Sequence, residues 1–171
     1  MRRLIVVSLL VLVAAVAYRS FGSAETATGT LTLQQPAPNV GQRAPEFTTR
    51  TAEGDRFTLS GNGVYVLTFW STLNESSNKA QPSFSELANE YGNDEVSFAA
   101  VYVNGVPDVG GAPYAMLQDG NGKLTSRYNV KRVPRLFLIE NGTVKLVLNG
   151  YYDGSEEDLK KKLQEILPDG S

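Results

Sequence analysis

Residues 64–82 read VYVLTFWSTLNESSNKAQP and predict a strand followed by a helix. The first seven are almost all apolar, which is typical of a strand that is buried on both faces of a sheet. Beyond the polar stretch, apolar side chains recur on one face at helical spacing: Ala80, Phe84, Leu87 and Tyr91. Asn74 or Ser76 can cap this helix, because either side-chain oxygen can accept a hydrogen bond from a free backbone N–H. We therefore expect a helix over about residues 75–91.

The segments on either side extend this unit into an α/β domain. Residues 95–104 form a second buried strand, so the order strand, helix, strand predicts a right-handed βαβ unit with parallel strands. The other expected elements are a hairpin over 46–61, an extended segment at 113–119, a short helix within 122–130, two strands joined by an Asn-Gly turn over 135–152, and a helix over 154–168 with Ser155 as its N-cap. This order predicts a thioredoxin-like fold, in which helices flank a central mixed sheet, with an added N-terminal β-hairpin.

The composition removes several kinds of chemistry. The 171 residues include no Cys and no His, so the chain can form no disulfide, thiolate nucleophile, Cys/His zinc site or imidazole base. The segment QDGNGK (118–123) lacks the acidic spacing of a calcium loop and is better interpreted as a turn. We expect no metal and no cofactor. With 16 Lys+Arg against 18 Asp+Glu and no long charge run, nucleic acid is not an expected partner.

The N-terminal residues have the pattern of an export segment. Two arginines precede an apolar run over 4–17, which suits a signal peptide better than a bilayer span of about 20 residues. The A-V-A at 15–17 offers a cleavage site, whereas an uncleaved segment would anchor the protein with its N-terminus in the cytoplasm. We therefore predict a signal peptide or signal anchor (1–19), a flexible tether (20–40) and a folded domain (41–168). The domain is expected to be exported, and to be either membrane-tethered or periplasmic or otherwise extracytoplasmic.

Four motifs follow one another in the predicted domain: VGQRAPEF (40–47), VYVLTFWST (64–72), SRYNVKRVP (126–134) and VPRLFLIENGTV (133–144). In their order and content they resemble the TlpA-like (ResA-type) thioredoxin family. Members of that family are exported thiol-disulfide oxidoreductases, often membrane-tethered, and many serve cytochrome c maturation. The resemblance implies the thioredoxin-like fold for most of the chain.

The chain departs from that family at the redox motif. Alignment on Phe69-Trp70 places Asn74 and Ser77 where the family has its two cysteines, so that NESS replaces C-x-x-C. Asn74 cannot attack a disulfide, and Ser77 has Lys79 as its only nearby candidate base. A hydroxyl at this position could instead stabilise the thiolate of an external thiol, but transferases of that kind need an additional helical domain. We predict no catalytic residue and no redox activity.

A second departure is a shortening in the middle of the domain. The family usually places a helix after the second buried strand, whereas this chain has only GVPDVGG at 105–111. Three glycines and a proline leave no room for even two helical turns. We therefore expect a shortened middle helix region, with part of one sheet face left open. Leu73 falls at the position of the family's second tryptophan.

A loop that resembles the family's cis-proline loop is retained at Val133-Pro134. In thioredoxin-like proteins this loop presents backbone groups that pair with an extended peptide, which needs no thiol. Cations surround the loop and would favour an acidic partner. The predicted binding residues are Trp70, Lys131, Arg132, Val133, Pro134 and Arg135, with Arg127 a turn earlier. Trp70 is included because it flanks the site in the family, although a tryptophan at a strand end is more often packed in the core.

The sequence therefore favours a non-catalytic binding or assembly module. The expected partner is an extracytoplasmic protein or an extended peptide, with the membrane as a further contact if the N-terminal segment is not cleaved. Two alternatives stay open. The family lineage implies a thiol-disulfide oxidoreductase or antioxidant protein, and a purely structural domain on a tether would bind nothing.

Overall fold

The computed structural model describes residues 37–93, 95–108, 110–151 and 154–167. The predicted signal segment and residues 20–36 of the predicted tether lie outside these ranges, so the export segment stays a prediction. In the described ranges, no helix combines the length and the apolar character needed to cross a bilayer.

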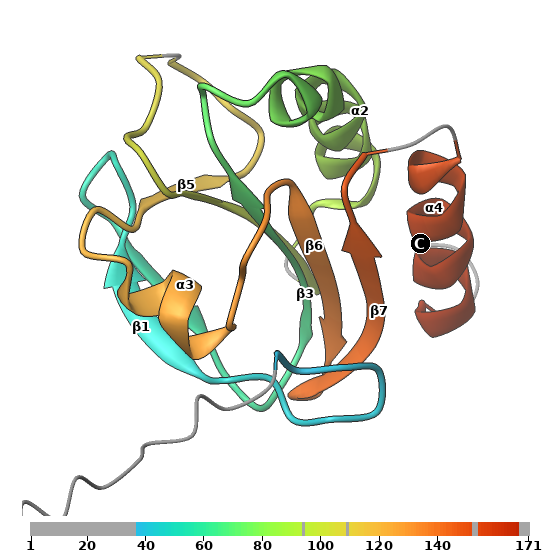
Figure 1. The fold of residues 1–171 in the computed structure, drawn as a ribbon. Coiled ribbons are helices and arrows are strands. Elements are labelled where there is room, and N and C mark those ends of the chain that lie inside the picture. Colours follow the sequence, from blue (N-terminus) through green and yellow to red (C-terminus); the bar gives the residue numbers. More distant parts are fainter. Residues whose placement is uncertain (1–36, 94, 109, 152–153, 168–171) are drawn as a thin grey trace, which may run out of the picture. The chain divides into compact units, whose positions relative to one another are not determined.

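The core of the domain is a five-stranded mixed sheet with strand order β5-β4-β3-β6-β7 (Figure 1). Its strands are β3 (Val64–Trp70), β4 (Val96–Tyr102), β5 (Ala115–Gln118), β6 (Arg135–Glu140) and β7 (Thr143–Asn149). β3 is parallel to β4 and antiparallel to β6, and β4 is parallel to β5. The last five residues of β3 are buried, as its apolar sequence predicts for a central strand.

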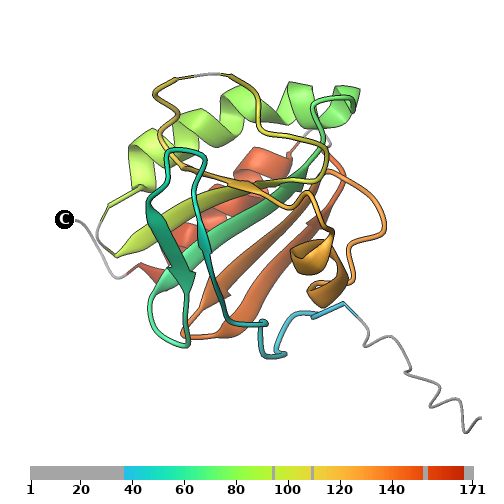
Figure 2. The same ribbon diagram turned by 90° about the vertical axis from the view of Figure 1, so that its left-hand side faces the viewer.

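Both faces of the sheet are covered. Helices α2 (Glu75–Tyr91) and α4 (Ser155–Ile166) pack on one face, where Phe84, Leu87 and Leu163 join one apolar cluster. The hairpin of β1 (Phe47–Arg50) and β2 (Arg56–Leu59) covers the other face together with α3 (Lys123–Arg127) (Figure 2). The predicted mixed sheet, flanking helices and N-terminal hairpin are thus confirmed.

The turn between β6 and β7 is the predicted Asn-Gly turn. Asn141 has φ 47° and Gly142 has φ 73°, which is the pair of positive angles that a type I′ hairpin turn requires. A Cβ on Gly142 would lie 3.1 Å from the Cα of Gly61, so the turn also needs glycine for space. The predicted N-cap of α4 is wrong by one position. Gly154, with φ 98°, precedes the first helical residue, and Ser155 lies buried inside the first turn.

The prediction of an open sheet face is also wrong. The described residues between β4 and β5 form no helix, as expected from the shortened segment. Tyr102 and Tyr114 are nevertheless 2% and 7% exposed, because their large rings pack around Trp70 and Phe84 and fill the place of a helix. Val106 of the connecting segment packs against the same cluster.

Candidate functional site

The start of α2, where the family has its dithiol, is a closed set of hydrogen bonds. Asn74 is the N-cap, and its Oδ1 accepts from the Ser77 N–H at 2.9 Å and from the Ser77 hydroxyl at 3.2 Å. The Ser71 N–H donates to Ser77 Oγ at 3.4 Å. Ser77 is only 2% exposed. Both positions therefore serve to begin the helix, and neither presents a nucleophile.

Lys79 is not placed to activate Ser77. Its Nζ lies 2.7 Å from Glu75 Oε1, and both side chains are largely exposed. The hydrogen bond and the charge of Glu75 raise the pKa of Lys79, so the amine stays protonated. A serine mechanism with Lys79 as the base finds no support in this geometry.

Residues 71–73, just before the helix, form a loop that is held in place by hydrogen bonds. Asn104 holds it from the end of β4: its Oδ1 accepts from the Thr72 N–H at 3.1 Å and its Nδ2 donates to Thr72 Oγ1 at 2.7 Å. Asn78 Nδ2 donates to the Thr72 carbonyl, and the Leu73 N–H donates to Ser71 Oγ. Leu73 at the tip of this loop is 87% exposed. The sequence gives only a weak indication of this exposed position, because Leu73 is a single apolar residue inside a polar run.

The proline loop lies at the same end of the sheet. β6 runs antiparallel to β3 with Phe69 opposite Arg135, so the residues before Arg135 lie beside the end of β3 (Figure 1). The Val133-Pro134 peptide bond is cis, and the Gly150 N–H donates to the Pro134 carbonyl at 2.8 Å. Within the described residues, no hydrogen bond is made by the backbone N–H or C=O of Val133.

Five of the predicted binding residues line one hollow of about 450 Å³, together with two residues that the sequence did not indicate: Lys131, Arg132, Val133, Pro134, Arg135, Asn149 and Gly150. Asn149 reaches this place because it pairs with Arg135 across β6 and β7, a register that no local pattern reveals. We call this feature the cationic hollow.

Arg135 is the most desolvated cation of the hollow. Its Nε is buried and has no hydrogen-bond partner in the described part of the chain. Its guanidinium carbon lies 5.2 Å from the centre of the Phe137 ring, and burial lowers the pKa of the group. An arginine remains charged under such a shift. The hollow therefore contains a positive group that forms no ion pair in the described part of the chain.

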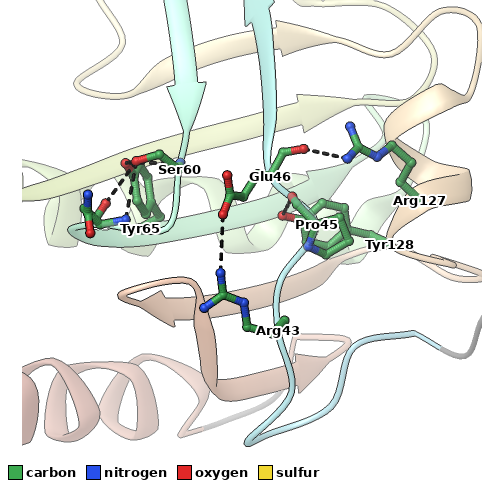
Figure 3. A network of polar contacts seen from close by, with 8 residues as sticks. Arg43, Pro45, Glu46, Ser60, Tyr65, Arg127 and Tyr128 are labelled. Carbon is green, nitrogen blue, oxygen red and sulfur yellow. Dashed lines mark hydrogen bonds and ion pairs between the residues drawn. The ribbon is translucent and has the colours of Figure 1, made fainter.

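Two residues from the predicted surroundings lie elsewhere. Trp70 is 2% exposed, with its ring centre 4.9 Å from that of Phe84, so it packs in the core and offers no surface for a partner. Arg127 donates from Nη2 to the Glu46 carbonyl at 2.6 Å on the hairpin side (Figure 3). It serves to hold the segment before β1 and is not part of the cationic hollow.

The neighbouring Tyr128 belongs to the same polar network. Its hydroxyl donates to the Pro45 carbonyl at 2.8 Å, and Arg43 lies 3.6 Å from the Glu46 carboxylate (Figure 3). Burial raises the pKa of Tyr128, which is fully enclosed. These contacts join α3, which leads into the proline loop, to the segment where the domain begins.

The loop before α3 does not have the features of a calcium site. Asp119 accepts hydrogen bonds from the N–H groups of Leu124 and Thr125 at 2.9 and 2.8 Å, so its carboxylate holds the start of α3. In the described ranges, no group of three or more acidic residues is placed to hold a metal ion.

The chain was compared with models of protein families, with curated proteins and with solved structures. The model of the AhpC/TSA family matches residues 40–147. A comparison with curated proteins found no match.

Solved structures with this fold include DsbE-like proteins. A putative thiol:disulfide interchange protein DsbE from Chlorobium tepidum is 23% identical, with a TM-score of 0.65 over 75% of this chain and 98% of that one. A secreted Mycobacterium tuberculosis disulfide oxidoreductase homologous to Escherichia coli DsbE is 25% identical, with a TM-score of 0.57 over 70% and 95%. An exposed lipoprotein thioredoxin from Streptococcus pneumoniae is 20% identical, with a TM-score of 0.60 over 71% and 99%. The resemblance inferred from the four sequence motifs is confirmed.

Proposed function

Because the chain belongs to the AhpC/TSA family and has no cysteine, we propose that it is a binding module with a thioredoxin-like fold and no redox activity of its own. It binds an extended segment of an extracytoplasmic protein at the loop over 131–135. Its role is to hold that partner in a complex, without catalysis.

The observation that carries this proposal is that the cationic hollow includes Val133, whose backbone N–H and C=O form no hydrogen bond within the described residues. A free N–H and a free C=O on one residue can form the hydrogen bonds of an added β-strand. Beside them, Arg132 and Arg135 form no ion pair in the described part of the chain. The bound segment therefore has an extended backbone and carries an acidic side chain for the hollow.

The absence of chemistry follows from the side chains at the start of α2. Thiol-disulfide exchange needs a thiolate to attack a disulfide sulfur, and the chain contains none. Asn74 and Ser77 are occupied with each other as a helix cap. A catalytic role would require a thiol from another molecule.

Export is supported by the N-terminal sequence. Arginines precede an apolar run over 4–17, and small residues at 15–17 follow the pattern of a cleavage site. Two of the similar structures are described as a secreted protein and as an exposed lipoprotein. The domain accordingly acts outside the cytoplasm, either on its tether or after cleavage.

Binding of labelled peptides tests the proposal. The probes are short fluorescein-labelled peptides rich in Asp and Glu, with matched peptides in which Asn and Gln replace the acids. Fluorescence anisotropy should show tighter binding of the acidic set, weakened by salt. Arg132→Glu combined with Arg135→Glu should weaken binding at least about tenfold, since charge-assisted contacts are lost.

Arg50→Glu combined with Arg56→Glu is the matched control, because it makes the same charge change on the exposed hairpin strands β1 and β2. It should alter the affinity less than about twofold. Equal binding of the two peptide sets, or equal losses in the loop variant and the control, would contradict the proposal. Absence of any binding would favour a structural domain.

A further inference from the structure

We propose that Leu73 forms an apolar subsite beside the cationic hollow, and that the bound segment carries one apolar side chain within about five residues of its acidic side chain. This inference rests on the proposed function and specifies the class of peptide that the site selects.

The first argument is the exposure of Leu73. It is 87% exposed, and Val40 is the other large apolar side chain exposed in the described ranges. Its sequence neighbours in the loop and at the helix start are polar, and at that exposure its side chain is covered by almost nothing in the described part of the chain. Covering such a side chain removes apolar surface from water and is favourable.

The second argument is that the loop is already ordered. Thr72 is held through its N–H, hydroxyl and carbonyl by Asn104 and Asn78, and Leu73 through its own N–H by Ser71. A loop held at both sides of its tip loses little backbone freedom when a partner binds. Leu73 is therefore presented as a fixed contact point.

The third argument is the distance to the hollow. Continuing the β3–β6 register by one residue places Trp70 opposite Pro134, across a strand spacing of about 4.8 Å. Leu73 follows Trp70 by three residues, which span at most about 11 Å. The Cα atoms of Leu73 and Pro134 are thus within about 16 Å, and an extended peptide covers that distance in about five residues.

Other occupants fit this surface less well. The apolar crevice between α2, α4 and the sheet measures about 40 Å³, which is room for about one water molecule and too little for the leucine of a second copy. A lipid surface would contact a single leucine next to the charged pair Glu75 and Lys79, and Val40 is the one further exposed large apolar side chain in the described ranges. The acid-binding hollow at the same end of the sheet points to a peptide.

The test uses labelled peptides with one fixed Asp and one Leu placed at successive distances from it, with Ser replacing Leu in the controls. The native domain should bind the best Leu peptide about tenfold or more tightly than its Ser counterpart, with the optimum at or below five residues. Leu73→Ser should reduce that preference below about twofold. Leu73→Met should keep it, because methionine offers a similar apolar side chain.

The possible outcomes separate the two proposals. If Leu73→Ser leaves the preference for Leu unchanged while the acid dependence persists, the inference fails and the proposed function stands. If the native domain shows no acid dependence either, the proposed function fails as well. Concentration-dependent dimerisation, or flotation with phosphatidylcholine–phosphatidylglycerol vesicles, that is lost in Leu73→Ser would also overturn the inference. Thermal melts should show that Leu73→Ser folds like the native domain, since the side chain is almost fully exposed among the described residues.

Discussion

Replacing Asn74 by alanine removes the acceptor on which the start of α2 depends. In the native domain its Oδ1 accepts from both the N–H and the hydroxyl of Ser77. Loss of an N-cap costs about 0.5–2 kcal/mol, and a buried hydroxyl left without its acceptor adds up to about 1–3 kcal/mol. The hydroxyl can rotate to another partner, so we expect a loss of about 2 kcal/mol in the free energy of unfolding. For a domain of about 130 residues this corresponds to a fall in Tm of about 6–8 °C.

Urea unfolding followed by tryptophan fluorescence measures this loss directly, because Trp70 is the single tryptophan and is buried. The midpoint should fall with an unchanged slope. Asn74→Asp is the matched control: it keeps the acceptor, adds negative charge at the helix N-terminus, and should be at least as stable as the native domain. An alanine variant within about 0.3 kcal/mol of the native domain would refute the assignment of Asn74 as the cap.

Three further results are expected. Gly142→Ala should lower stability by about 1–3 kcal/mol in the same assay, because its φ is 73° and its Cβ would meet the facing backbone at 3.1 Å; an unchanged midpoint would contradict the turn geometry. Burial raises the pKa of Tyr102 and Tyr128, so the domain loses stability as the pH rises through about 10, with a slope for each tyrosine that approaches about 1.4 kcal/mol per pH unit at higher pH. Urea titrations between about pH 9 and 11 measure this loss, which should total about 1.4 kcal/mol for each tyrosine over that range, and Tyr128→Phe should reduce it. Lys79→Ala should leave both Tm and peptide binding unchanged, since its ion pair lies in solvent; a clear loss of binding would show that Lys79 belongs to the site.

The parts of the fold that follow from neighbouring residues could be predicted from the sequence. The bounds of α2 match the prediction, because Asn74 and the apolar stripe lie within the helix itself or next to it. The Asn141-Gly142 turn is equally local. The N-cap of α4 was missed by one residue, since both Gly154 and Ser155 are acceptable at such a position and only the backbone angle distinguishes them.

Features that depend on distant contacts could not be predicted. The rings of Tyr102 and Tyr114 cover the sheet face by packing around Trp70. The order of polar and apolar residues in the sequence does not predict this packing. Arg127 was grouped with the loop cations by its sequence position, yet it bonds to Glu46, which is 81 residues away. Asn149 enters the cationic hollow only through the β6–β7 register. Residues 131–135, which the sequence analysis grouped together, thus line one hollow, but the sequence did not indicate the other residues of its lining, and their binding role stays a prediction.

The central claim is that the start of α2 keeps the arrangement of a redox site while its chemistry has been removed. The most direct measurement is insulin reduction with dithiothreitol by the native domain and by Asn74→Cys with Ser77→Cys. Residues three apart in the first helical turn are within reach of a disulfide, and the helix N-terminus lowers the pKa of the first thiol. We predict no rate above the reagent blank for the native domain and a clear rate for the double variant. Turnover by the native domain, or a folded double variant that forms the disulfide and remains inactive, would contradict the account.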